Sequence, residues 1–186
     1  GKWKNIYEDV NLPDINCQEG EFKNQPEQFK MLKGMWDKTK NLQDRYIDNK
    51  AGVEKFKKEV LLKRESVDLK EDVGSISECI EKLRKLYYGL AAYCDDQIGR
   101  LIEFINKKGL RENTLIIFSS DHGQQYFDHG FHDKHNFYDS SWRVPLIISM
   151  PGTLPEGEER KFAIWNDITT TILAAAGTEC ETMQGF

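Results

Sequence analysis

The chain has 186 residues, of which 39% are hydrophobic and 31% are charged, and its formal net charge is −5 at pH 7. This is the composition of a polar globular protein, and its acidic balance gives no electrostatic reason to expect nucleic acid as a partner. The longest apolar runs, Leu115–Phe118 and Pro145–Met150, are far shorter than the roughly 20 residues of a membrane-spanning helix.

Residues 1–74 predict an irregular start followed by helical sequence. Residues 1–25 contain the breakers Pro13 and Gly20 and few repeating apolar positions. From Pro26 to about residue 49, apolar side chains recur at helical spacing. Residues 50–74 are dense in Lys and Glu, which is typical of a solvated helix face or a surface insertion.

The clearest predicted element is a helix from Ser75 to about Lys108. Ser75 or Ser77 can cap its first turn, and Gly109 ends it. Apolar residues recur along it in steps of three or four and predict one buried stripe: Ile76, Ile80, Leu83, Tyr87, Leu90, Cys94, Ile98, Leu101 and Ile105.

Two short apolar runs then predict strands. Thr114–Ser119 is apolar on both faces, as expected for a central strand of a covered sheet. Pro145–Ser149 predicts a second strand, and residues 167–176 predict a last helix that ends at Gly177. Because strands and helices alternate, the sequence belongs to the α/β class.

The four histidines of the chain lie in one window directly after the first predicted strand: His122, His129, His132 and His135. Asp121 and His122 come first, at the edge where open α/β sheets bind ligands. A carboxylate beside an imidazole is half of a divalent-metal site. Lys134 is a point charge suited to an anion such as sulfate or phosphate. A cation and a lysine on one tetrahedral anion would stabilise charge on its oxygens.

Two other interpretations of this window stay open. Asp121-His-Gly123 is also typical of a plain turn, in which the aspartate accepts backbone hydrogen bonds and the glycine tolerates a positive φ. A zinc site could instead use His129, His132 and His135, although their spacing places only two of them on one helical face. The crowding of histidines around Lys134 favours a ligand site over a turn.

From about residue 80 to its end, the chain resembles the sulfatase family of the alkaline-phosphatase-like superfamily. The matching stretches occur in the family's order: Tyr87–Leu101, Asn113–Gly123, Phe127–Gly130, Lys134, Tyr138, Arg143–Ile148, Asp167–Ile172, Ala176–Gly177 and Met183–Gly185. The resemblance implies an α/β fold in which helices sandwich a sheet, with residues 75–186 forming part of that core. Residues 1–74 match poorly and would be a helical and loop segment on the substrate side.

The resemblance also implies roles for individual residues. Asp121 and His122 would bind a divalent metal, usually calcium, and Lys134 would contact the sulfate of a sulfated small molecule or glycan. His129 would support catalysis close to the site. Because calcium prefers oxygen ligands, a histidine ligand leaves a softer ion open. The remaining histidines match no family ligand and are expected to be bystanders: His132 and His135.

The nucleophile of the family is missing from these 186 residues. Sulfatases convert the Cys or Ser of a Cys/Ser-x-Pro-x-Arg motif into formylglycine, and this sequence contains no such motif. We expect it upstream of Gly1. Asp95 and Asp96 correspond to a structural acid of the family's long helix, so we do not expect them to be catalytic.

These observations predict an internal piece of a sulfatase that is inactive alone and has the remainder of its domain as partner. The resemblance suggests a periplasmic, extracellular or lysosomal location. The alternatives are a phosphonate or phosphate diester hydrolase of the same superfamily, or a non-catalytic scaffold with this fold.

Overall fold

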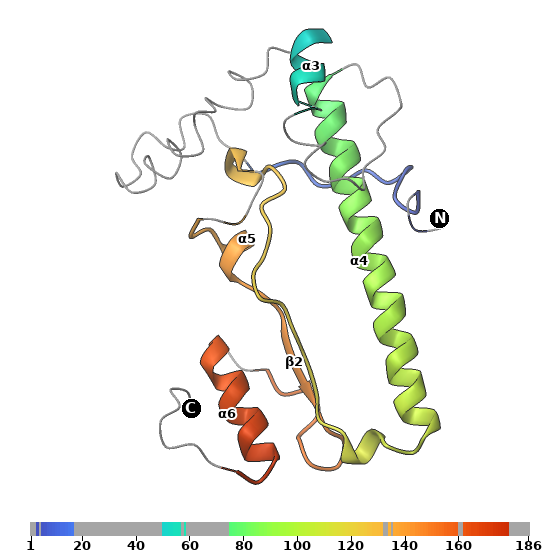
Figure 1. Cartoon of the computed structure of the whole chain (residues 1–186), viewed down its shortest axis with the longest axis vertical. Coiled ribbons are helices and arrows are strands. Elements are labelled where there is room, and N and C mark those ends of the chain that lie inside the picture. Colours follow the sequence, from blue (N-terminus) through green and yellow to red (C-terminus); the bar gives the residue numbers. More distant parts are fainter. Residues whose placement is uncertain are drawn as a thin grey trace. The chain divides into compact units, whose positions relative to one another are not determined.

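The computed structural model describes residues 3, 5–16, 50–56, 58, 75–131, 134, 136–159 and 162–178 (Figure 1). Two compact units make up the chain: Gly1–Arg100 with Ser120–Pro145, and Leu101–Ser119 with Leu146–Phe186. The elements are, in chain order, α3 (Lys50–Phe56), α4 (Ile76–Lys107), η2 (Arg111–Asn113), β1 (Ile116–Ser119), η3 (Asp128–Gly130), α5 (Asp139–Trp142), β2 (Leu146–Ser149) and α6 (Trp165–Ala175). The helix expected over residues 26–49 lies outside the described residues.

Helix α4 confirms the long helix that the sequence predicts. Its start is a reciprocal cap: the Glu78 amide donates to Ser75 Oγ at 3.1 Å, and the Ser75 amide donates to the Glu78 carboxylate at 3.3 Å. Its end comes before Gly109, which has a φ of 66°. Since only glycine adopts that conformation without strain, Gly109 stops the helix as expected.

The apolar stripe of α4 is buried only over its first part. Ile76, Ile80 and Leu83 are buried together with Cys79. From Tyr87 onward the prediction is wrong for this chain, because the larger side chains of the stripe stay exposed: Tyr87 at 40%, Leu90 at 57% and Leu101 at 59%. The periodicity identified the helix correctly. In the described part of the chain this length of the face is covered only in part: the ring centroids of Tyr87 and Tyr126 lie 4.1 Å apart, while Leu90 and Leu101 stay exposed.

The N-terminal segment is anchored on α4 by polar contacts, and Figure 1 shows it in blue crossing the helix. Arg84 donates to the Pro13 carbonyl at 2.7 Å, and Lys85 donates to the Glu8 carbonyl at 2.8 Å. Residues 5–16 form turns and irregular chain without helix or strand, which confirms the irregular start over that range.

Strands β1 and β2 form a two-stranded antiparallel sheet with Ile116 opposite Ser149 and Ser119 opposite Leu146. Both runs were predicted as strands. The covered sheet expected around them is not what the described residues form: Phe118 is 38% exposed and its register partner Ile147 is 58% exposed. Strand β1 therefore has the apolar sequence of a central strand, but the sheet face that carries Phe118 and Ile147 is exposed in the described part of the chain.

Helix α6 confirms the last predicted helix, and it begins two residues earlier than expected, at Trp165. Its first turn is capped by Asp167, whose carboxylate accepts a hydrogen bond from the Ile164 amide at 2.9 Å. It ends before Gly177, whose φ is 69°. Among the helices described, none combines the length and the apolar character that crossing a membrane requires.

Candidate functional site

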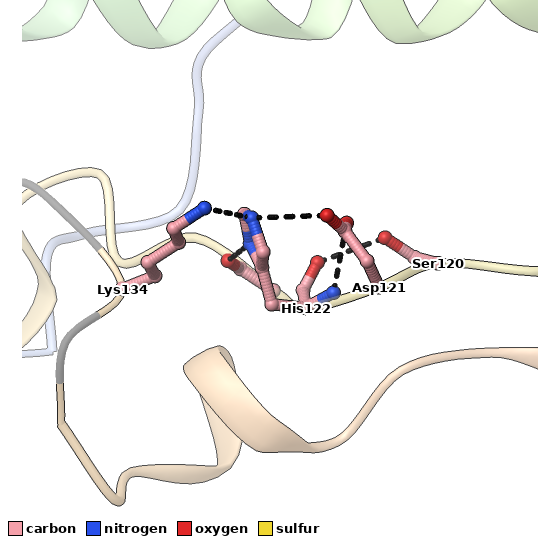
Figure 2. A network of polar contacts seen from close by, with 5 residues as sticks. Ser120, Asp121, His122 and Lys134 are labelled. Carbon is pink, nitrogen blue, oxygen red and sulfur yellow. Dashed lines mark hydrogen bonds and ion pairs between the residues drawn. The ribbon is translucent and has the colours of Figure 1, made fainter. Parts of the chain in front are cut away.

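Asp121 and His122 lie where the chain bends after β1 (Figure 2). The His122 amide donates to Asp121 Oδ1 at 2.9 Å, and Ser120 Oγ donates to the His122 carbonyl at 2.8 Å. The turn interpretation is therefore correct for the aspartate. It is wrong for Gly123, which is not among the glycines with positive φ. A side chain there would instead collide with α5, because an added Cβ would lie 2.8 Å from the carbonyl carbon of Ser140.

One hydrogen bond determines which ring nitrogen of His122 carries the proton. Nδ1 lies 2.7 Å from the Gly123 carbonyl oxygen. A carbonyl oxygen can only accept, so Nδ1 donates, and in the neutral ring Nε2 keeps its lone pair. Anchoring one nitrogen on a backbone carbonyl while the other stays free to accept is the usual arrangement of a metal-binding histidine.

Nε2 of His122 faces two charged side chains, with Asp121 on one side and Lys134 on the other (Figure 2). Asp121 Oδ2 lies 3.4 Å from Nε2, and the Lys134 ammonium donates a hydrogen bond to Nε2. The Asp121 side chain is 76% exposed and that of His122 is 33% exposed. Surface contacts of this kind, even between two full charges, stabilise a fold by about 0–1 kcal/mol at most. The cluster is therefore open to a ligand and contributes little to stability.

The donor atoms of Asp121 and His122 fit a shared cation. Two ligands about 2.0–2.4 Å from one ion and at right angles to each other lie about 3 Å apart, and Asp121 Oδ2 and His122 Nε2 are 3.4 Å apart. No group of three or more His, Cys, Asp or Glu side chains that could hold a metal is found within the described ranges. The chain thus brings together two side chains of the types that can bind a metal.

His129 contacts the N-terminal segment and the residue before α5. Its backbone has a φ of 54°, and its amide donates to the Asn16 carbonyl at 2.6 Å. Its ring stacks on Tyr138, with the ring centroids 3.7 Å apart and the planes 3° from parallel. The structure thus places His129 as a packed residue that joins the N-terminal segment to the loop before α5.

The other candidate residues divide into two groups. Asp95 and Asp96 lie within α4 as expected, and Asp96 Oδ2 accepts a hydrogen bond from Gln97 at 3.0 Å. His132 and His135 lie outside the described residues, as does the zinc site that would require them.

Sequence reasoning missed three residues beside the cluster. Gln125, Asn136 and Ser141 are buried and hydrogen-bonded to one another. Polar residues in a loop are normally exposed, and nothing in their spacing indicates that they pair. Their burial depends on contacts between segments that are distant in the sequence, which no local pattern reveals.

A family model described as Sulfatase matches residues 19–178 of the chain. Choline-sulfatase of Rhizobium meliloti (strain 1021) is 35% identical over 104 residues, which cover 56% of this chain and 20% of the relative. Iduronate 2-sulfatase of Homo sapiens is 38% identical over 84 residues, or 44% of this chain and 15% of the relative. The chain therefore spans at most about a fifth of the length of these curated relatives.

Two solved structures share the fold. A phosphonate monoester hydrolase from Silicibacter pomeroyi superposes with a TM-score of 0.69 at 24% identity, covering 95% of this chain and 30% of that one. A protein solved in complex with its substrate D-glucosamine-2-N,6-O-disulfate gives 0.68 at 22% identity, covering 99% and 42%. At these identities the likeness concerns the fold, and it confirms the α/β, alkaline-phosphatase-like architecture expected from the sequence.

Proposed function

This chain belongs to the sulfatase family, and we propose that it contributes three active-site side chains to a sulfuric ester hydrolase. Asp121 and His122 would hold a divalent cation, and Lys134 would bind a sulfate oxygen. The substrate would be the sulfate ester of a small molecule or a glycan. One relative is a choline-sulfatase and one structural neighbour was solved with a disulfated glucosamine as its substrate, so both substrate types occur among similar proteins.

The observation that carries the proposal is the setting of the His122 ring. Its Nδ1 is held by the Gly123 carbonyl, and its Nε2 lies between the Asp121 carboxylate and the Lys134 ammonium. A plain turn would need the backbone bonds of Asp121 but would not need a lysine from twelve residues further along the chain. The meeting of ligand-type donors and a fixed cation at one exposed place supports a binding site.

The donor atoms bear on the identity of the cation. Calcium is bound mainly by oxygen atoms, whereas imidazole suits zinc, copper, iron and nickel. The Asp121–His122 pair offers one oxygen donor and one imidazole nitrogen donor. Calcium, which the family resemblance favours, therefore competes with softer ions, and the remaining ligands of the full site decide between them.

Lys134 and the cation would share the task of neutralising the sulfate. A divalent cation bound there would supply positive charge next to the sulfate oxygens. Lys134 adds an ammonium with three donors, which binds an oxyanion as a point charge. Preorganised charge of this kind lowers the barrier of a reaction in which negative charge builds up on the oxygens.

The nucleophile must come from elsewhere. The 186 residues contain no Cys/Ser-x-Pro-x-Arg sequence, and the chain spans 20% of the choline-sulfatase it resembles. We therefore infer that it provides part of an active site and has no turnover by itself. The other part would hold the formylglycine precursor and further metal ligands.

A phosphonate or phosphate diester hydrolase is the second candidate. The structural neighbour from Silicibacter pomeroyi is a phosphonate monoester hydrolase, and a protein of Trinickia caryophylli that is 37% identical over 102 residues is named a multifunctional alkaline phosphatase superfamily protein. A cation and a lysine bind any tetrahedral oxyanion, so these residues alone do not select sulfate. A non-catalytic scaffold with this fold is the third candidate.

Comparative kinetics of the full-length protein that contains this chain test the proposal. We expect faster hydrolysis of an aryl sulfate than of an aryl phosphodiester, and no turnover of either by the 186-residue chain. Lys134→Ala in the full-length protein should damage turnover and sulfate binding. A preference for the phosphodiester would favour the second candidate, and inactivity on both substrates would favour the scaffold. Near-normal kinetics of the Lys134 variant would refute the role of Lys134.

A further inference from the structure

The described residues contain one cluster of buried polar side chains, and it lies beside Lys134. The cluster consists of three residues whose exposed fractions are 1% for Gln125, 5% for Asn136 and 3% for Ser141. We propose that Gln125 is a positioning residue, which holds Lys134 against His122 by joining the two segments that carry them. This inference concerns the geometry of the pair, and only its effect on sulfate binding rests on the proposed function.

Gln125 uses both ends of its amide in this cluster. Its Nε2 donates to Asn136 Oδ1 at 2.6 Å and to Ser141 Oγ at 3.1 Å. Its Oε1 accepts from Ser140 Oγ at 2.6 Å. One side chain therefore links the turn that carries His122 to the loop that carries Lys134 and to the first turn of α5.

The backbone of Tyr138 fixes the direction of these bonds. Its amide donates to Asn136 Oδ1 at 3.1 Å, and an amide N–H can only donate. The atom of Asn136 at this place is therefore the oxygen, and the Gln125 atom that faces it must be the nitrogen. The network thus has one consistent orientation, which a hydrophobic contact of the same size would not impose.

The network reaches both functional segments through the main chain. The Asn136 amide donates to the Lys134 carbonyl at 2.7 Å, two residues away. On the other side, the Gly123 amide donates to the Ser141 carbonyl at 2.8 Å. Gly123 directly follows His122, whose ring faces Lys134. A shift of Asn136 would therefore displace Lys134 relative to His122.

The cluster also carries a cost that points to a role in geometry. Asn136 Nδ2 is buried and has no hydrogen-bond partner among the described residues. Buried polar groups are nearly always satisfied, and an orphan lowers stability. Apolar side chains of the same volume would avoid that penalty, but they would not fix the position of the loop to within the length of a hydrogen bond.

Nuclear magnetic resonance of the 15N-labelled 186-residue chain tests this inference without needing activity. In the wild type, the Lys134 ammonium occupies Nε2 of His122 and keeps the proton on Nδ1. Gln125→Leu keeps most of the volume but removes all three bonds, so Lys134 should drift and the His122 ring nitrogens should shift toward a mixture of tautomers. The sulfate dissociation constant should rise about tenfold or more, since misplaced binding groups lose affinity steeply.

Two further variants make the result specific. Ser140→Ala removes only the bond to Gln125 Oε1 and should shift the His122 signals in the same direction by a smaller amount. If the Gln125→Leu chain does not fold, the Ser140→Ala chain tests the positioning role in its place. Ser149→Ala is the matched control, because it removes a side-chain bond to Arg111 in the other compact unit and should leave both readouts unchanged.

The inference is overturned if a folded Gln125→Leu or Ser140→Ala chain keeps the wild-type His122 spectrum. It is also overturned if Ser149→Ala causes the same change. If the wild-type chain binds no sulfate, the proposed function loses support at this site. The His122 spectrum still tests the positioning role in that case, so the two failures are distinguishable.

Discussion

Lys134 donates a hydrogen bond from its ammonium to Nε2 of His122, twelve residues earlier in the chain. That nitrogen is also the atom with which His122 would bind a cation, because Nδ1 is engaged with the Gly123 carbonyl. The ammonium and a cation bound there would therefore compete for one lone pair. Cation binding would release Lys134 toward an anion, so under the proposed function cation and anion binding would be linked.

Replacing Lys134 should have opposite effects on the two ligands. Lys134→Met removes a hydrogen bond and a positive charge from Nε2, so affinity for a divalent cation should rise by about fivefold, which corresponds to about 1 kcal/mol. Sulfate affinity should fall. Titration calorimetry with calcium, zinc and sulfate measures both. Lys107→Met, on the exposed end of α4, is the control, and a fall in cation affinity for Lys134→Met would contradict the competition.

Removing either proposed ligand should weaken cation binding about tenfold or more, as changes in the immediate surroundings of metals commonly do. Asp121→Asn tests the carboxylate while keeping an acceptor for the His122 amide, and His122→Ala tests the imidazole. Asp95→Asn, at an exposed position on α4, should change nothing. Equal affinities for all of these chains would show that the cation binds elsewhere.

Two glycine substitutions should change stability in opposite directions. In Gly123→Ala the new methyl group would meet the Ser140 carbonyl, with 2.8 Å to its carbon atom, and should cost about 1–3 kcal/mol. In Gly99→Ala nothing lies within 4 Å of the added carbon, and alanine in a helix interior should add up to about 1 kcal/mol. Urea unfolding followed by circular dichroism measures both. A Gly123→Ala chain as stable as wild type would disprove the close approach of the turn to α5.

His129 should matter for stability and leave ligand binding unchanged. Its φ of 54° is strained for a residue with a side chain, so His129→Gly should be about 1 kcal/mol more stable than His129→Ala. Both variants lose the stack on Tyr138. Sulfate and cation affinities measured on the same samples should match the wild type. A large loss of sulfate affinity in both variants would give His129 a direct role.

Helix α4 could be predicted because its signals are local. Ser75 and Glu78 cap it, the apolar period runs along it, and Gly109 ends it. The exposure of the stripe from Tyr87 onward could not be predicted, because periodicity identifies an apolar face but does not tell what covers it.

The candidate site shows the same division. Asp121, His122 and Lys134 could be identified as a group because their residue types are those of ligands and anion-binding groups. The cluster of Gln125, Asn136 and Ser141 could not, because uncharged polar residues in loops carry no such signal. The sequence predicts a positive φ as the reason for a glycine at position 123, and this reason is wrong. The glycine is needed because a larger residue would not fit against α5.

The most direct test of this account is the sulfate affinity of the 186-residue chain, measured with and without a saturating divalent cation. If Asp121, His122 and Lys134 form one site, the cation should raise sulfate affinity about tenfold, and Asp121→Asn should abolish that increase. Sulfate affinity that is the same with and without a bound cation would contradict the account, because the two ligands would then occupy independent places.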